Sequence, residues 1–398
     1  MGILAESFGI AVEYFVVEED NLQLGKVPAE LFAMTFDGPY QLYQSPQPGV
    51  IRLASKTVSQ NVNYLDYGLA ETIVGINRKL AEYKMRLMPG AMHPLRKGSE
   101  LLDFIPTNSA EEAIKKLFLP AGHGWLNRSA CDVRLSFSDD DEFSRLHAAA
   151  RIILPIVPAL TASSPILEGM RTGMRSIGFK QFIERYSKFQ MLQAGEVPEP
   201  VFSEKKYEES ILNPLRSMLD SKGFSKVIGP EAINARGVTA DFKLKEIKIQ
   251  CTEPQECSAA QLAVSRLIIE AIRAMANEQW VTHEQQMRAV TSNLAGLIVE
   301  SAESGMGAEV FSSEYLSFFG MDDNKTIREV WKHIFDTLSL NPEKPLARYE
   351  QELSVILQQG SLSDRVLTVL GENPQFDEVL AVYRNLCDCL NQNRLFIL

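Results

Sequence analysis

Short segments in which apolar and polar residues alternate are the feature that most restricts the fold of this chain. Successive side chains of a β-strand point to opposite faces of a sheet, so alternation predicts a strand with one buried face. The pattern predicts strands at residues 8–17, 50–55, 130–137, 238–243 and 246–251. If these strands share one sheet, their apolar faces pack together on helices and their polar faces form a common surface.

The polar faces of these strands carry isolated charged residues, which we call the charged floor. Its members are Glu13, Arg52, Asp132, Arg134, Glu246 and Lys248. Three are acidic and three are basic, so the floor is neutral overall. Such a surface is either a ligand-binding floor or simply the solvated face of an antiparallel sheet, and alternation alone favours the second explanation.

Helical periodicity predicts the rest of the chain. Helices are expected at residues 61–85 and 110–119, and Ser138 is expected to cap a helix whose first turn is acidic. After residue 254 apolar residues recur at helical spacing. We therefore predict an α+β protein with a single domain over residues 1–398, in which residues 8–254 bear the strands and residues 255–398 are mostly helical.

Composition excludes some classes of function. With 40 basic and 51 acidic side chains, the formal charge is -11, which argues against a nucleic-acid or anionic-membrane surface. The five cysteines show no zinc-finger spacing, and the N-terminus lacks the basic region of a signal peptide. The longest apolar stretch, residues 152–160, is too short to span a bilayer. These features predict a cytoplasmic protein with free thiols.

Five short motifs resemble those of the carboxylate–amine ligase (glutamate–cysteine ligase type 2) family and occur in its order. They are GIAVE at 9–13, resembling G-x-E-x-E; AMHP at 91–94, resembling G-T-H-P; CDVRL at 131–135, at the place of H-V-H; PALTASSPILEGMRTGMRS at 158–176, resembling L-S-A-S-S-P-x-x-x-G-x-D-T-G-x-x-S; and EIKIQCTEP at 246–254, resembling E-x-R-x-x-D-T-x-P. An alternative register places the last strand motif on residues 239–243.

This resemblance implies a glutamine-synthetase-like fold, a curved antiparallel sheet with helices on one face and a helical C-terminal portion. In that family the concave face of the sheet holds ATP and divalent metal ions. A carboxylate, typically that of glutamate, is phosphorylated, and an amine then attacks the acyl phosphate to form an amide. The resemblance implies catalytic positions at Glu13, Glu246 and Lys248, and substrate or anion binding by Arg52, Asp132, Arg134 and His93.

Several positions depart from the family pattern. Ala11 and Arg52 replace acids, Asp132 and Arg134 replace the two histidines of H-V-H, and Lys248 replaces an arginine. The arginine expected after the T-G segment falls near Gly178. Arginine stays protonated and only donates hydrogen bonds, so it cannot ligate magnesium. We therefore predict no metal ligands and no divalent ion held by three or more residues of the floor.

Three functions stay open on this sequence. The first is an ATP-dependent carboxylate–amine ligase with an altered site, using ATP and magnesium if it is active. The second is a catalytically silent relative, without a cofactor, that binds a small anionic ligand or a protein partner. The third is a purely structural or scaffolding protein. A homodimer surface on the C-terminal helices is compatible with all three.

The functions differ in what the basic residues of the charged floor are expected to contact. We expect Arg52, Arg134 and Lys248 to converge on a phosphate, sulfate or carboxylate. In the alternative, the arginines pair with the acids of the floor and leave it inert. A lone histidine such as His93 is more often structural than a ligand.

Overall fold

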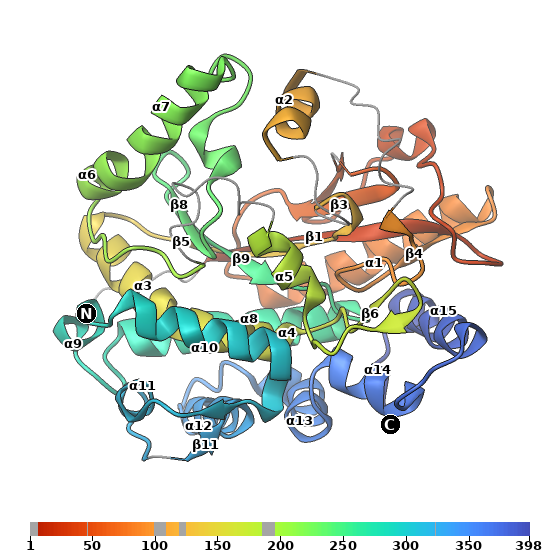
Figure 1. Cartoon of the computed structure of the whole chain (residues 1–398). Coiled ribbons are helices and arrows are strands. Elements are labelled where there is room, and N and C mark those ends of the chain that lie inside the picture. Colours follow the sequence, from red (N-terminus) through yellow and green to blue (C-terminus); the bar gives the residue numbers. More distant parts are fainter. Residues whose placement is uncertain (1–6, 46, 99–108, 119–124, 185–195, 323) are drawn as a thin grey trace.

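The computed structural model describes residues 7–45, 47–98, 109–118, 125–184, 196–322 and 324–398. At its centre lies a seven-stranded antiparallel sheet in the order β2-β3-β1-β5-β9-β8, with β4 paired to the far end of β1 (Figure 1). The strands of this sheet are β1 (Phe8–Glu18), β2 (Tyr40–Gln44), β3 (Val50–Ser55), β4 (Met85–Met88), β5 (Cys131–Ser136), β8 (Val238–Asp241) and β9 (Glu246–Thr252). Two small hairpins are formed by β6 (Ile166–Leu167) with β7 (Met170–Arg171) and by β10 (Glu309–Val310) with β11 (Lys325–Thr326).

Helices lie on both sides of this sheet (Figure 1). In the first half of the chain they are α1 (Val62–Ala81), α2 (Ser109–Phe118), α3 (Asp140–Ile153), α4 (Val157–Thr161), α5 (Ile177–Glu184), α6 (Glu204–Tyr207) and α7 (Asn213–Lys222). The second half contains α8 (Ser258–Ala276), α9 (His283–Met287), α10 (Thr291–Ser304), α11 (Ser313–Ser317), α12 (Ile327–Ser339), α13 (Glu350–Gln359), α14 (Leu362–Leu370) and α15 (Phe376–Gln392).

The main hydrophobic core lies between the apolar face of the sheet and the helices α1, α3 and α8. Ile10, Val12 and Tyr14 of β1 belong to this core, together with Leu69 of α1 and Leu267 of α8. The alternation in the sequence thus predicted the buried face correctly. The α+β class, with an antiparallel sheet, helices on its apolar face and a helical C-terminal portion, is confirmed. The single-domain assignment stays a prediction, although strands and C-terminal helices share this core.

The opposite face of the sheet is divided into a polar part and an apolar part. Phe15 and Val17 lie on the same face of β1 as Glu13, yet both are buried in a second core with residues of α14 and α15. They project beyond the end of β5, where β4 is the neighbouring strand. The C-terminal helices therefore cover this end of the face and leave the charged floor at the other end.

Several predicted boundaries were wrong. The helix expected over residues 61–85 ends at Ala81, and Met85 instead begins β4 after a turn in which Lys84 has φ 56°. The strand expected over 238–243 ends at Asp241. The Asp241 carboxylate accepts hydrogen bonds from the backbone N–H groups of Lys243 and Leu244, which form a turn there.

One predicted cap was also wrong, and two strands of the large sheet were missed. Asp139, rather than Ser138, caps α3 by accepting from the Glu142 N–H. The strands β2 and β4 were not predicted.

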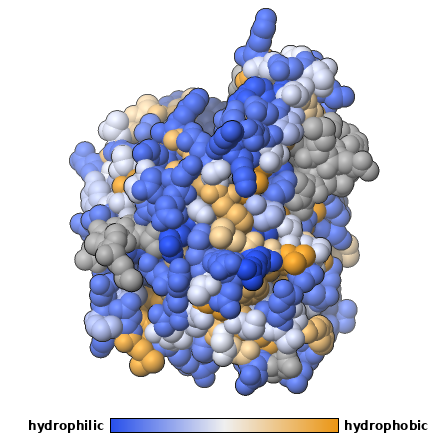
Figure 2. Space-filling view, turned by 90° about the vertical axis from the view of Figure 1, so that its left-hand side faces the viewer, coloured by the Kyte–Doolittle hydropathy of each residue, from blue (hydrophilic) through white to orange (hydrophobic). Residues whose placement is uncertain are grey.

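Hydrophilic residues cover most of the face shown in Figure 2, and hydrophobic residues form small separate areas, one of them in a hollow near the centre. Within the described residues, one segment, Asp140–Thr161, has the length and mean hydropathy of a membrane span. However, 94% of its apolar window is buried inside the fold, as in the core helix of a soluble protein.

Candidate functional site

The strand register brings the six residues of the charged floor onto one face of the sheet. Glu13 of β1 lies directly opposite Arg52 of β3, and Arg134 of β5 lies opposite Lys248 of β9. Glu246 precedes Lys248 by two positions and shares its face. The structure therefore places together six of the seven residues that the sequence singled out for the site.

Arg52 joins two buried acids of the floor. Its guanidinium lies 2.5 Å from Asp132 Oδ2 and 3.7 Å from Glu13 Oε1. Burial acts to raise the pKa of Asp132, but Arg52 and Lys248 lower it, and the resulting pKa lies below the usual value. Burial raises the pKa of Glu13 above its usual value although Arg52 is near.

Glu13 is held by further donors. Its Oε1 accepts from the Ser45 hydroxyl at 3.1 Å, and its Oε2 accepts from the Ala130 N–H at 3.0 Å. Both carboxylate oxygens are thus engaged by the protein. These bonds fix the orientation of the Glu13 carboxylate beside Arg52.

Arg134 crosses β1 to reach the next strand. Its Nη2 donates to the carbonyl oxygen of Ser55 at 2.8 Å and to the Ser55 hydroxyl at 2.7 Å, while Nη1 lies 3.4 Å from Glu246. The crossing passes over Gly9, where a Cβ atom would lie 2.5 Å from Ser55 Oγ and 3.1 Å from Arg134 Nη2. The first glycine of the GIAVE motif is therefore the space through which Arg134 extends.

Lys248 differs from the two arginines. Within the described residues its ammonium group forms no salt bridge and no hydrogen bond, although its charge helps to lower the pKa of Asp132. Its side chain lines a pocket of about 240 Å³ over the floor, together with Arg52 and Arg134. Asn234 and Thr239 supply polar side chains at the same pocket. Glu231, Asp241 and Glu246 also line this pocket, but within the described residues none of them forms a direct salt bridge with Lys248.

His93 is separated from the charged floor and does not line its pocket. The ring Nε2 lies 2.8 Å from the Leu22 carbonyl oxygen, and Nδ1 accepts from the Arg96 N–H at 3.1 Å. Burial lowers the pKa of His93 to about 4. A neutral ring with both nitrogens bonded to backbone groups favours the structural alternative over the predicted ligand-binding role.

The sequence pattern did not identify the buried Glu253 carboxylate as a hydrogen-bond partner of the Ser-Ser-Pro segment. Glu253 accepts from the Ser163 N–H at 2.5 Å, from the Ser164 hydroxyl at 2.8 Å and from the Ser176 hydroxyl at 2.6 Å. Gly178 leaves room for it, since a Cβ there would lie 2.7 Å from Glu253 Oε1. Burial raises the pKa of Glu253 although these hydrogen bonds oppose the change. The motif residues therefore join the end of β9 to residues 163–178.

Arg128 was also missed. It precedes β5, is buried, and places its guanidinium 5.0 Å from the centre of the Phe182 ring. It contributes a further positive charge near Glu13 and Asp132. The pattern of alternation could not identify it, because it lies outside the strand.

The donor atoms of the floor do not fit the metal arrangement that the family resemblance implies. Glu13 and Asp132 are bound by Arg52, and Glu246 lies beside Arg134. In the described parts of the chain, no group of three or more His, Cys, Asp or Glu residues is arranged to hold a metal ion. Hard cations require several oxygen ligands, and here those oxygens face guanidinium groups.

Comparison with known proteins identifies a related family and related folds. The model of glutamate–cysteine ligase family 2 matches residues 40–218, which include Arg52, Asp132, Arg134 and the Ser-Ser-Pro segment. The resemblance to this family is confirmed. A relative from Archaeoglobus fulgidus, described as an uncharacterized protein, is 25% identical over 365 residues, 88% of this chain and 87% of that protein.

Solved structures of this ligase group share the fold. Glutamate–cysteine ligase from Francisella tularensis, in complex with AMP, has a TM-score of 0.64 at 10% identity and covers 97% of this chain and 89% of its own. A bifunctional glutathione synthetase from Pasteurella multocida has a TM-score of 0.61 at 14% identity, covering 96% of this chain and 52% of its own longer chain. At these identities the likeness shows the glutamate–cysteine ligase-like fold.

Proposed function

We propose that this protein is an ATP-dependent carboxylate–amine ligase of the glutamate–cysteine type, with an altered site. The family match and the fold support the ligase class. The observation that carries the proposal is the pocket over the charged floor, where the Lys248 ammonium forms no direct salt bridge or hydrogen bond within the described residues. A half-buried cation without a direct salt bridge remains available to an anionic ligand.

In this proposal Lys248 and Arg134 bind the carboxylate and phosphate oxygens of the substrates over the floor. The acid is phosphorylated by ATP, and an amine displaces the phosphate from the acyl phosphate to form the amide. Glu13 and Asp132 hold Arg52 in place, and Glu246 orients Arg134. Because the acids are committed to arginines, no step of this proposal depends on a protein-bound metal.

Calorimetric titration with ATP tests this proposal, once with magnesium and once with a chelator. We expect binding in both, because the cations of the floor meet the phosphates directly. Lys248→Met should weaken ATP binding about tenfold or more, the loss expected for a charged hydrogen bond. The matched control is Lys243→Met, which removes an exposed lysine from the turn before β9.

Turnover is tested separately, by release of phosphate with glutamate and a panel of amines. ATP binding that requires magnesium, or that Lys248→Met and Lys243→Met reduce equally, contradicts the proposed use of the floor. Phosphate release that depends on both acid and amine establishes the ligase.

A second candidate, a catalytically silent relative that binds a small anion or a protein partner, is favoured by Arg52. This residue places a guanidinium between Glu13 and Asp132, where it neutralises both acids. Binding of phosphate or ATP without turnover in any combination of acid and amine supports this candidate. A cytoplasmic location and a homodimer formed through the C-terminal helices are further proposals of ours.

A further inference from the structure

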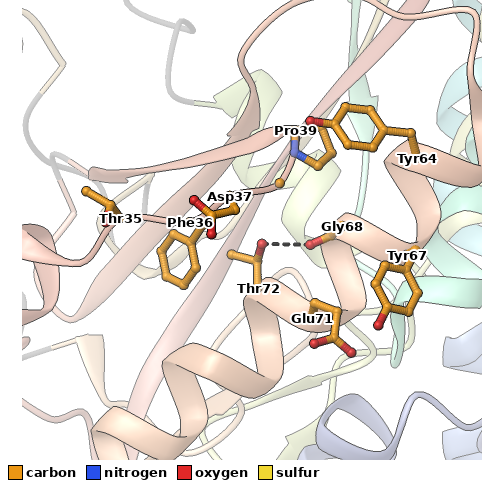
Figure 3. Close-up of a pocket in the computed structure, with 10 residues that line it drawn as sticks. Thr35, Phe36, Asp37, Pro39, Tyr64, Tyr67, Gly68, Glu71 and Thr72 are labelled. Carbon is orange, nitrogen blue, oxygen red and sulfur yellow. Dashed lines mark hydrogen bonds between the residues drawn. The ribbon is translucent and has the colours of Figure 1, made fainter.

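A second pocket, of about 440 Å³, lies on the other side of the molecule's sheet, between residues 35–39 and the first half of α1 (Figure 3). The loop at residues 35–39 approaches α1 closely where Pro39 contacts Gly68, and the pocket lies beside this contact. A Cβ atom at Gly68 would lie 2.2 Å from Pro39 Cδ, so only glycine allows this contact. The Thr72 hydroxyl donates to the Gly68 carbonyl oxygen at 2.6 Å, which leaves it no proton for a ligand.

Aromatic side chains line this pocket from both sides. Phe36 comes from the loop, while Tyr64 and Tyr67 come from α1, as Figure 3 shows. Tyr64 is 49% exposed and Tyr67 is 69% exposed, which is unusual for side chains of this size. Neither ring contributes to the main core. The pocket therefore includes exposed aromatic side chains in its lining.

Two carboxylates complete the lining. Asp37 lies on the loop and Glu71 on the helix, and both are exposed. Within the described residues neither forms an ion pair or a hydrogen bond, and no lysine or arginine lines the pocket. The Lys56 ammonium donates to the neighbouring Phe36 carbonyl oxygen at 3.1 Å but does not line the pocket. The pocket thus combines aromatic walls with two carboxylates that form no salt bridge within the described residues.

We propose that this pocket binds a small organic cation, an ammonium or guanidinium compound with a compact apolar part. A cation is attracted to the faces of aromatic rings within about 6 Å and to the two carboxylates. A metal ion is disfavoured, since only two carboxylates line the pocket and no group of three or more His, Cys, Asp or Glu residues in the described chain is arranged to hold one. A nucleotide or other anion is disfavoured by the charge of Asp37 and Glu71.

This inference does not depend on the proposed ligase function. α1 packs against the apolar face of the sheet, whereas the charged floor lies on the opposite face. A ligand in this pocket therefore does not contact Lys248 or Arg134. Loss of binding here and loss of binding at the floor are separable measurements.

Two probes of the same shape test the proposal by calorimetry on the full chain. Benzylammonium is the cation, and benzyl alcohol is its neutral counterpart. We expect benzylammonium to bind at one site about tenfold more tightly than benzyl alcohol, because only the cation gains the ring and carboxylate interactions. Added sodium chloride should weaken only the benzylammonium interaction.

Variants locate the site. Asp37→Asn combined with Glu71→Gln should reduce the preference for the cation to about threefold or less, while the exposed control Glu300→Gln leaves it unchanged. Tyr67→Phe keeps an aromatic face and should retain binding, whereas Tyr67→Leu should weaken it. These exposed positions lie outside the core, and matching melting curves verify that each variant is folded.

Three outcomes overturn the proposal. The first is no benzylammonium binding, or equal affinity for the two probes in the unaltered protein. The second is an unchanged preference in the Asp37→Asn/Glu71→Gln variant. The third is equal binding by Tyr67→Phe and Tyr67→Leu.

Discussion

Single residues of the same charge have different roles in this site, because their roles depend on what lies within hydrogen-bonding distance. Arg52 forms salt bridges with Glu13 and Asp132, whereas the Lys248 ammonium forms no direct salt bridge among the described residues. The acids of the floor were predicted either to hold a ligand or to pair with the arginines. The structure shows the pairing for Arg52 and leaves Lys248 facing the pocket.

His93 gives a prediction at this scale. Burial lowers its pKa to about 4 from the usual value of 6.5, so the folded protein keeps it neutral where the unfolded chain binds a proton. Its contribution to the free energy of unfolding is therefore full above pH 6.5 and falls as the pH is lowered towards 4, by about 1.4 kcal/mol per pH unit at most. Below pH 4 the contribution is constant.

Urea unfolding between pH 4 and 7.5 measures this effect. The difference in free energy of unfolding between the unaltered protein and His93→Gln should shrink as the pH falls, since glutamine does not titrate. The buried His147, left in place in both proteins, cancels in the comparison. A difference that stays constant across this range contradicts a neutral, buried His93.

At the scale of elements, β1 organises the site through one glycine. Arg134 reaches from β5 to β3 across Gly9, and both of its bonds to Ser55 depend on that space. Register alone does not reveal this, since a side chain normally interacts with the adjacent strand. The Arg134 side chain thus links β5 to β3 across β1 on the polar face of the sheet.

Gly9→Ala is expected to be destabilising by about 1–3 kcal/mol, because the added methyl group overpacks the space used by Ser55 and Arg134. Chemical denaturation measures the loss, and Gly9→Ala/Ser55→Ala should recover part of it. The matched control is Gly296→Ala in α10, where no atom lies within 4 Å of the new methyl group. That change should be neutral or stabilising by up to about 1 kcal/mol. Equal effects of the two single substitutions would refute the crossing.

At the scale of the whole molecule, a buried ion pair connects the C-terminal helices to the rest of the fold. Arg365 of α14 lies 2.5 Å from Glu256, just before α8, and both side chains are fully buried. Arg365 also donates to the backbone carbonyl of Phe396, near the end of the chain. These bonds hold α14 and the last residues in place, and α14 and α15 in turn cover Phe15 and Val17.

Arg365→Leu should lower the free energy of unfolding by about 3–5 kcal/mol, because it leaves the Glu256 carboxylate buried without its cation. Arg365→Leu combined with Glu256→Leu should be less destabilising than the single change, since no charge is then stranded. Urea unfolding of the two single variants and the double variant forms the complete cycle. A double variant as unstable as the sum of the singles would contradict coupling between these groups.

The sequence by itself determined which residues of each strand face the main core and which share the charged floor. Alternation is a local property, so the faces of β1, β3, β5 and β9 followed from it. Only the tertiary structure decided the partners on that floor, because pairing depends on which strands are neighbours and on their register. It also decided that α14 and α15 bury Phe15 and Val17, and that Glu253 lies among the serines of the Ser-Ser-Pro segment. These contacts join residues far apart in the chain, and no local pattern of polar and apolar residues encodes them.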